Sequence, residues 1–580
     1  MDFSELVLGG FTGLKDSQTK VMYPTVSYSG KYIASIMPIE TPNAQTVTQY
    51  QILIRSSKSL LVKKQIRLPM GFVPRFVKWF EPAAPIFGTD HIAVPLHDNV
   101  NRIFAADHAG EIRVWEIDDM IDKSSNLIDL LKAEVVIRQV SWGSNVPVRN
   151  VVWGRSPEEI LVFSDFQVSI AIWSLVDRRS VEVYHPKFIT SKGFSFQPGT
   201  RHLTVLTRPV SDDMITVYGG TGDLETLSRF VLPEFYDVKG FKWSPDGKFV
   251  AAYDNITNFE VGIYTALGTL YRVFTAPDIG LGVQDIEWSP AGNLLAVASY
   301  DGVIRCLNTL TFTPNLILIH SETINIKKPL VFVEQPVRDS SGHAKYQRVD
   351  RYPVRPPKVR TNLTDAPPKT GFSVMKFNRD GSLLATKFDL IPTTLWIWSL
   401  RSMEPVAILV HVRKIKSVEW HPQHPHLLLT VCAGSRTRDD ETYENYDLAD
   451  VGEENDCCIH VYSSEWRNIY TIKVPKVAGE FASVTDATWL RNEVETEISS
   501  DTSADEDSKF AARSRVLVCD HGSYTIGYLD DDQEPEDDDT KVQRLIDGVQ
   551  QQEWAETTTA SCLDDTFAMF DTQRKVISGM

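Results

Sequence analysis

Three closely spaced histidines are the residues whose types most suggest chemistry. His421, His424 and His426 lie in the stretch His-Pro-Gln-His-Pro-His. Imidazole nitrogens can bind zinc, but such a site needs further ligands in a closed geometry. The stretch also falls where other parts of the chain have a Ser-Pro-x-Gly turn. We therefore interpret it as a turn filled with polar residues, and predict no metal site there.

The cysteines and the familiar catalytic motifs give no sign of an enzyme. None of the six cysteines belongs to a C-x-x-C pair, which argues against both a zinc site and a disulfide framework. The sequence has no phosphate-binding G-x-x-x-x-G-K-[ST] loop, no H-E-x-x-H and no G-x-S-x-G. We therefore expect no catalytic, cofactor-binding or metal-binding residues, no cofactor and no small-molecule substrate. The cysteines are Cys306, Cys432, Cys457, Cys458, Cys519 and Cys562.

The N-terminus and the hydrophobic runs predict a protein of the cytoplasm. The opening MDFSELVLGG lacks the basic and apolar regions of a signal peptide. No apolar run reaches the roughly 18 residues of a membrane span, so no membrane partner is expected. Free cysteines fit a reducing compartment.

The net charge of −17 is concentrated in three segments. Residues 439–456, 491–508 and 530–539 together hold 24 acidic residues and one basic residue. The rest of the chain, with 58 basic and 52 acidic residues, is mildly basic. Acidic runs with few apolar residues cannot bury enough surface to offset their ordering entropy. We interpret them as solvated insertions.

A repeat dominates the chain and must position every other feature. In its clearest copy, Val283–Trp288 alternates with period two and is followed by Ser-Pro-Ala-Gly, the apolar stretch 294–299 and Asp301-Gly302. The neighbouring copy ends its first strand at Trp243, followed by Ser-Pro-Asp-Gly. Such Pro and Gly positions are typical of tight turns. The pattern predicts short antiparallel strands that end in an aromatic residue.

Nine aromatic residues can be aligned as the anchors of this repeat. Four of the spacings are 43 to 47 residues, close to the period of about 40–45 residues in WD40 propeller blades. The predicted fold is therefore an all-β, WD40-type β-propeller with degenerate repeats and about nine blade-like units. One large ring, two joined rings, or a seven- or eight-bladed ring with an appended unit all remain open. The anchors are Tyr28, Trp79, Trp153, Phe196, Trp243, Trp288, Phe377, Trp420 and Trp489.

The repeats lack parts of the usual WD40 hydrogen-bond network. No Gly-His dipeptide opens the blades, and the closing Trp-Asp is replaced by Trp-Glu or Trp-Ser. We therefore expect packing to carry more of the stability than usual. A strand at Phe3–Leu8 could complete the last blade and close the ring, which would leave no long exposed sheet edge.

The expected organisation has four parts. Propeller blades over residues 1–311 hold about six repeats, and a basic, Pro-rich insertion covers 312–370. Further blades over 371–530 carry acidic loops at 435–456 and 491–508. Residues 531–580 form an acidic segment and a tail. In that tail Val542, Leu545, Ile546 and Val549 have the spacing of a short amphipathic helix.

Six basic residues in the insertion are the candidate partner-binding site. A basic strip could dock an acidic surface, such as a tubulin tail. Sparse aromatic residues make nucleic acid the weaker choice. The alternatives are an exposed linker and an extra strand pair laid on the ring. The six residues are Lys345, Arg348, Arg351, Arg355, Lys358 and Arg360.

The order of these motifs resembles a known family. Several stretches are similar to WD-repeat protein eight, the centrosomal and spindle-pole WD-repeat family. They are the opening Met-Asp-Phe-Ser-Glu, the stretches 241–247 and 294–302, and Phe377–Thr386 followed by Ile391-Pro392 and Leu395-Trp-Ile-Trp-Ser399. The resemblance covers roughly residues 1–490 and points to a fungal member. The acidic insertions depart from the family's compact pattern.

The resemblance implies a non-catalytic scaffold at the spindle pole body or centrosome, in the cytoplasmic cytoskeleton. Its implied partners are a coiled-coil spindle-pole protein and a minus-end-directed motor of the kinesin-14 class, and through them microtubule minus ends. Together they would anchor microtubules and support the mitotic spindle. A second hypothesis is a propeller of the translation-initiation type that binds ribosomes or RNA, which the mildly basic body would suit.

Overall fold

The computed structural model describes most of the region in which the repeats were predicted. It contains two units, Met1–Leu529 and Asp530–Met580. The second unit, with run 530–539 and the predicted helix, lies outside the described residues, as does nearly all of the other two acidic runs. Among the described helices, none is long and apolar enough to cross a membrane. The described residues are 2–3, 24–39, 49–57, 60–82, 100–107, 110–117, 135–137, 147–219, 225–276, 281–325, 329–338, 344–359, 370–433, 443–444, 458–465, 469–472, 485–491, 514–519 and 524–529.

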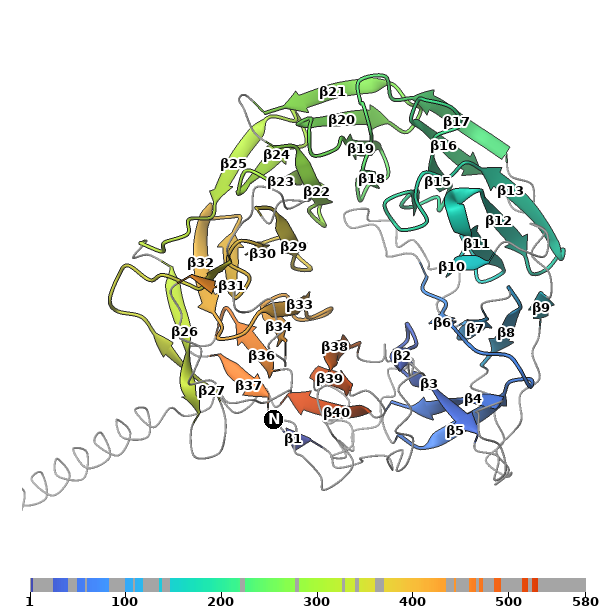
Figure 1. The fold of residues 1–580 in the computed structure, drawn as a ribbon, viewed down its shortest axis with the longest axis horizontal. Coiled ribbons are helices and arrows are strands. Elements are labelled where there is room, and N and C mark those ends of the chain that lie inside the picture. The colour runs from blue at the N-terminus through green and yellow to red at the C-terminus, as the bar shows by residue number, and fades with distance from the viewer. Residues whose placement is uncertain are drawn as a thin grey trace, which may run out of the picture. The chain divides into compact units, whose positions relative to one another are not determined.

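Nine antiparallel sheets follow one another around a ring in the first unit, as Figure 1 shows. We number these blades one to nine in chain order. Blades one to three comprise β2 (Thr25–Val26), β3 (Tyr32–Ile39), β4 (Gln49–Ser56) and β5 (Val62–Arg67); β6 (Phe76–Trp79), β7 (Arg102–Ala106), β8 (Ile112–Glu116) and β9 (Val135–Ile137); and β10 (Val148–Trp153), β11 (Glu159–Ser164), β12 (Ser169–Ser174) and β13 (Arg179–Tyr184), with the short 3₁₀ helix η1 (Asp165–Gln167) between β11 and β12.

The next three blades repeat this arrangement. Each has four strands that pair in chain order. They comprise β14 (Phe194–Phe196), β15 (Leu203–Thr207), β16 (Met214–Gly219) and β17 (Glu225–Val231); β18 (Gly240–Trp243), β19 (Phe249–Tyr253), β20 (Glu260–Thr265) and β21 (Leu270–Thr275); and β22 (Val283–Trp288), β23 (Leu294–Ser299), β24 (Val303–Asn308) and β25 (Pro314–Ile319).

Blade seven differs because two extra strands enlarge its sheet. Its basic set is β29 (Phe372–Phe377), β30 (Leu383–Phe388), β31 (Thr394–Ser399) and β32 (Glu404–Val410). Strand β26 (Leu330–Arg338) pairs in parallel with β32, and β27 (Ala344–Arg348) pairs with β26 at the outer edge. Of the alternatives for the insertion, residues 330–348 thus form the extra strand pair. The start of the region predicted as insertion, β25, belongs to blade six instead.

The last two blades close the ring. They comprise β33 (Ile415–Trp420), β34 (Leu427–Cys432), β36 (Cys458–Ser463) and β37 (Tyr470–Ile472); and β38 (Asp486–Leu490), β39 (Ser514–Cys519) and β40 (Tyr524–Leu529) with β1 (Asp2–Phe3). Strand β1 pairs with β40, so the two ends of the unit share blade nine. Residues 4–8 of the predicted closing strand lie outside the described residues. A small sheet pairs β28 (Lys358–Val359) with β35 (Tyr443–Glu444).

The core lies between the blades. Nine clusters of buried apolar side chains can be defined among the described residues, and each joins the facing sheets of two consecutive blades. One of them packs Ile33 of blade one against Leu490, Leu517 and Ile526 of blade nine. Because the last blade packs on the first, the described residues form a single nine-bladed ring, and two joined rings are excluded.

The predicted anchors stand at or near the ends of the innermost strands. The indole N–H of Trp153 donates to the carbonyl of Lys78 in the preceding blade, 3.1 Å away, and that of Trp288 donates to the carbonyl of Lys242 at 3.2 Å. Trp79, Trp420 and Trp489 make the same type of bond at 2.9–3.1 Å. The repeated tryptophan therefore does more than fill space, because it ties each inner strand to its predecessor.

The turns after the anchors are also alike in their bonding. The hydroxyl of Ser244 accepts the N–H of Phe249, and that of Ser289 accepts the N–H of Leu294. Gly247 has φ +69°, the left-handed backbone that the sequence motif predicted. At the corresponding place in blade eight, Nδ1 of His421 accepts the N–H groups of Gln423 and His424. The histidine-rich stretch is thus a turn, as predicted.

Candidate partner-binding surface

The six basic residues predicted to bind a partner lie on blade seven or just after it. Arg348 ends β27, and Arg351 and Arg355 follow it; all three side chains are exposed. Lys358 is half-buried, and its Nζ lies 2.7 Å from Glu322 Oε2, so part of its charge is already neutralised. Lys345 belongs to β27, but its side chain, like the whole of Arg360, lies outside the described residues.

Blades two to seven share a feature that the sequence reasoning did not use. In each of them an aspartate lies between the second and third strands, and its carboxylate accepts at least one backbone N–H. Each bond is charge-assisted, which makes it stronger than one between neutral groups. The repeats therefore retain an acidic turn despite losing other parts of the network. The residues are Asp107, Asp165, Asp213, Asp254, Asp301 and Asp389.

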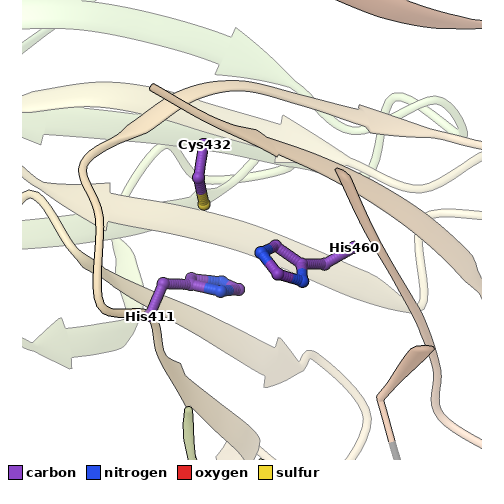
Figure 2. Close-up of side chains that lie close together, drawn as sticks. All are labelled: His411, Cys432 and His460. Carbon is purple, nitrogen blue, oxygen red and sulfur yellow. The ribbon is translucent and has the colours of Figure 1, made fainter. Parts of the chain in front are cut away.

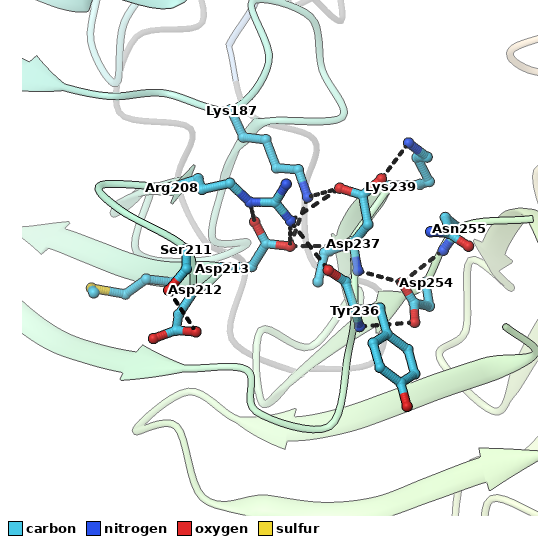
Figure 3. Close-up of polar contacts among 12 residues, drawn as sticks. Lys187, Arg208, Ser211, Asp212, Asp213, Tyr236, Asp237, Lys239, Asp254 and Asn255 are labelled. Atoms are coloured by element: carbon cyan, nitrogen blue, oxygen red, sulfur yellow. Dashed lines mark hydrogen bonds and ion pairs between the residues drawn. The ribbon is translucent and has the colours of Figure 1, made fainter. Parts of the chain in front are cut away.

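Asp213 is the centre of an ionic network between blades four and five, shown in Figure 3. Its buried carboxylate lies 2.6 Å from Nζ of Lys187 and accepts two bonds from the guanidinium of Arg208, at 2.7 and 2.8 Å. It also accepts the backbone N–H of Val238 at 2.8 Å. A buried carboxylate is tolerated only when it is paired and hydrogen-bonded, and Asp213 meets both conditions.

A second carboxylate completes the charge balance. Asp237 lies 2.8 Å from Nζ of Lys187 and 2.7 Å from Nζ of Lys239. Partial burial opposes its ionisation, but the hydrogen bonds and charges of these two lysines outweigh that effect and hold the pKa of Asp237 well below its usual value. Asp254, beside it, accepts the backbone N–H groups of Tyr236 and Asp237. The connection between β17 and β18 is thereby held from both sides.

The network supports loops that display apolar side chains to solvent. Phe166, Tyr184, Val210 and Tyr236 are 84%, 59%, 90% and 81% exposed. We call these four residues the apolar rim. Phe166 also has φ +56°, an uncommon conformation for a bulky residue. Exposed aromatic residues on ordered loops are typical of protein-binding surfaces, where tyrosine in particular is enriched.

Hydrogen bonds connect the neighbouring segments that carry the apolar rim. The N–H of His185, next to Tyr184, donates to the carbonyl of Val168 in the segment that follows Phe166. The N–H of Arg208 donates to the carbonyl of His185, and its guanidinium reaches the carbonyl of Tyr236 at 3.5 Å. The four side chains therefore come from adjoining loops of blades three to five, with Arg208 and Lys239 beside them.

Sequence reasoning missed the rim for a simple reason. The sequence does not show whether a phenylalanine or valine in a loop is buried in the core or exposed to solvent. Only the exposed fraction of the side chain in the structure distinguishes the two. The one available signal was the placement of Phe166 and Val210 next to Asp, Ser and Pro residues that favour turns.

A second group of polar side chains, shown in Figure 2, is the candidate for holding a metal ion. His411, Cys432 and His460 are buried, and one ligand atom from each lies within 4.8 Å of the others. Burial and the neighbouring His460 lower the pKa of His411 to about 3, so its imidazole is neutral at neutral pH. The sequence gave no warning, because these residues are not spaced as a metal motif.

Comparison with known proteins places the chain in a class. Residues 268–308 match the family model described as WD domain, G-beta repeat. Over 301 residues the chain is 28% identical to WD repeat-containing protein WRAP73 of Mus musculus, a match that covers 49% of this chain and 64% of the mouse protein. It is 26% identical over 391 residues to an uncharacterized WD repeat-containing protein of Schizosaccharomyces pombe, covering 67% of this chain and 73% of that protein.

Solved structures with a similar fold include two propellers. The C-terminal WD40 domain of Sif2 superposes with a TM-score of 0.39 and 12% identity, covering 79% of this chain and 96% of that one. The β-propeller domain of Cps50 (Swd1) from Myceliophteria thermophila gives 0.30 and 14%, covering 57% and 89%. The nine-bladed ring and the WD40 match define a WD40-type β-propeller, a class of protein-interaction scaffold.

Proposed function

We propose that this chain is a non-catalytic scaffold of the spindle pole body or centrosome. With a coiled-coil partner and a minus-end-directed kinesin of the kinesin-14 class, it anchors microtubule minus ends and supports spindle organisation. The spindle-pole assignment is supported by the resemblance of the central repeats, and the scaffold role by the surface of the ring.

The apolar rim is the observation that carries the scaffold role. Leaving Phe166, Val210 and Tyr236 in water forgoes about 1.5–3 kcal/mol for each side chain that a partner could bury. The loops of Val210 and Tyr236 are held by the buried carboxylates of Asp213 and Asp254, so little ordering of these loops is needed on binding. A surface that is both apolar and preorganised is suited to a stable protein partner.

The chemistry of the rim fits a helical partner. An amphipathic helix places apolar residues at i, i+3, i+4 and i+7 against such a surface. The exposed arginines of blade seven, Arg348, Arg351 and Arg355, offer a second basic surface for the acidic tails of a cytoskeletal partner.

Affinity purification of the tagged full-length protein from dividing cells, followed by mass spectrometry, tests the proposal. We expect a coiled-coil spindle-pole protein and a minus-end kinesin to be recovered. The double variant V210D/Y236A should lose the coiled-coil protein at least about tenfold, because it places a charge at the centre of the rim.

The matched control is L267A. Leu267 is 81% exposed, but it lies between the third and fourth strands of blade five, at the opposite end of the strands from the rim. This variant should recover the same partners as the wild type. Recovery of ribosomal proteins or initiation factors without spindle components would overturn the proposed function in favour of a translation role. Unchanged recovery by V210D/Y236A would exclude the rim as the binding surface.

A further inference from the structure

Three buried ligand groups meet at the interface of blades seven and eight. His411 follows the last residue of β32, Cys432 ends β34, and His460 lies in the middle of β36. Their relative exposures are 2%, 1% and 1%. The thiol of Cys432 points toward the two imidazole rings in Figure 2. Three different strands or strand ends thus direct nitrogen and sulfur atoms to one place.

The bonding of His411 leaves one ring nitrogen available. Its Nδ1 lies 2.7 Å from the hydroxyl of Tyr346, and the two atoms share one hydrogen bond. When Nδ1 donates this bond, Nε2 carries the lone pair that a cation needs. Nε2 of His411 has no hydrogen-bond partner among the described residues.

This arrangement resembles the outer shell of a metal site. A histidine ligand usually donates its second ring N–H to a carboxylate, a carbonyl or a similar acceptor, which fixes its tautomer and orientation. The hydroxyl of Tyr346 takes this place beside Nδ1 of His411. On the other side, Nδ1 of His460 lies 3.1 Å from Oγ1 of Thr471 in β37. Each imidazole is therefore oriented by a hydroxyl.

The strand register adds a second thiol. Cys432 and Cys458 are direct partners across the β34–β36 pair, so their side chains lie on the same face. His460 is two residues after Cys458 in the same strand and shares that face. Burial is the largest cause that raises the pKa of Tyr346 well above its usual value, and the thiols of Cys432 and Cys458 add to this effect. Cys458 is thus the additional thiol that the strand register brings to this face.

We propose that His411, Cys432 and His460 bind a zinc ion, with Cys458 as the fourth ligand, and that this site ties blade eight to blade seven. Two imidazoles and two thiolates are a donor set that tetrahedral zinc prefers. Zinc bonds of about 2.0–2.3 Å require ligand atoms roughly 3.3–3.8 Å apart. The present spread of up to 4.8 Å closes by rotation of the side chains, including a tilt of the stacked rings, whose centroids are 4.9 Å apart.

The first test measures metal on the full-length protein. Purified under reducing conditions and loaded with zinc alone, the wild type should retain about one ion per chain after desalting. Cobalt substituted for zinc should produce a thiolate-to-cobalt charge-transfer band and the d–d bands of a tetrahedral ion. A wild-type protein that retains no metal and gives no such bands would overturn the proposal without reference to any variant.

The second test assigns the ligands. C432S and H460Q should each lose at least about tenfold in zinc affinity, and C458S should lower the charge-transfer intensity by removing one of two thiolates. The control is C306S, which changes a fully buried thiol in blade six, away from the cluster. Circular dichroism shows which variants keep the β-sheet spectrum. Equal zinc binding and unchanged cobalt spectra in folded C432S and wild type would exclude the site.

Discussion

The two buried polar clusters of the ring are built on opposite principles. Between blades four and five, Asp213 is surrounded by Lys187, Arg208 and a backbone N–H, so charge and hydrogen bonds balance within the protein (Figure 3). Between blades seven and eight, His411 and its neighbours present ring nitrogens and a thiol toward one another, and Nε2 of His411 has no partner among the described residues (Figure 2).

The difference teaches what each cluster can do. A closed ionic network has no ligand capacity left, so its role is to hold the loops that display the apolar rim. A cluster of neutral donors with a free lone pair is incomplete by itself and gains most from a cation. Similar degrees of burial thus lead to a structural part in one case and a binding site in the other.

Removing the central carboxylate should break the first cluster most severely. Asp213→Ala leaves Lys187 buried without its main partner and the N–H of Val238 without an acceptor. The free energy of unfolding should fall by about 3–5 kcal/mol. Chemical denaturation followed by circular dichroism measures it. Asp212→Ala, which changes the exposed neighbour, should stay within about 0.5 kcal/mol of wild type. Equal effects of the two changes would contradict the central role of Asp213.

Deleting one hydroxyl should weaken the second cluster in two ways. Tyr346→Phe removes the hydroxyl that is hydrogen-bonded to Nδ1 of His411 and should cost about 1–3 kcal/mol of stability. Because the hydroxyl also orients the imidazole, zinc affinity should drop about 10–100-fold. Competition with a chromophoric chelator gives the affinity. Tyr271→Phe, at an exposed site on blade five, serves as the control; a Tyr346 variant that binds zinc like this control would refute the orienting role.

A milder change on the other side of the same cluster should have a smaller effect. Thr471→Val removes the hydroxyl that holds Nδ1 of His460, with little change in side-chain shape. A loss of about 0.5–1.5 kcal/mol is expected, with a weaker reduction in zinc affinity than for Tyr346→Phe. The same denaturation and chelator measurements apply. If Thr471→Val proves the more damaging of the two, His460 and not His411 is the ring whose orientation matters more.

The ionic cluster should make the free energy of unfolding fall slightly as the pH is lowered. The folded-state pKa of Asp237 lies below its ordinary value of 3.8. Its contribution is therefore complete above the unfolded pKa and is lost as the pH falls through the folded pKa. The effect is limited because Asp237 is 28% exposed. Unfolding followed from about pH 5 to pH 3 should show a shallower loss of stability in Asp237→Asn than in wild type. Parallel curves would contradict the assignment.

Much of the ring could be predicted from residues that recur. Trp153, Trp243 and Trp288 end strands because each packs in the interface with the preceding blade and donates its indole N–H to that blade, a demand that repeats in most of the blades. The turn at Ser244–Gly247 was recognisable because a left-handed φ leaves few residue choices. The extra strand pair of blade seven was only one of the open alternatives, since β26 pairs in parallel with a strand about 75 residues later.

The candidate sites were much harder to predict from the sequence. Arg348, Arg351 and Arg355 are exposed, as a basic, Pro-rich segment should be, and their partner-binding role stays a prediction. The rim and the histidine–cysteine cluster were not foreseen. Phe166 and Tyr236 are 70 residues apart, and Tyr346, His411 and His460 lie on three separate segments.

By itself the sequence determined the kind of repeat and the order of its anchors, because period-two apolar strands, anchoring aromatics and turn residues act locally and repeat, whereas the closure of one nine-bladed ring came from the tertiary structure. Only the tertiary structure decided which polar groups meet. Whether Tyr346 touches His411, or Asp213 touches Lys187, depends on how β26 crosses to β32 and how one blade is rotated against the next. Those geometries arise from packing across the whole interface, and no single stretch of residues encodes them.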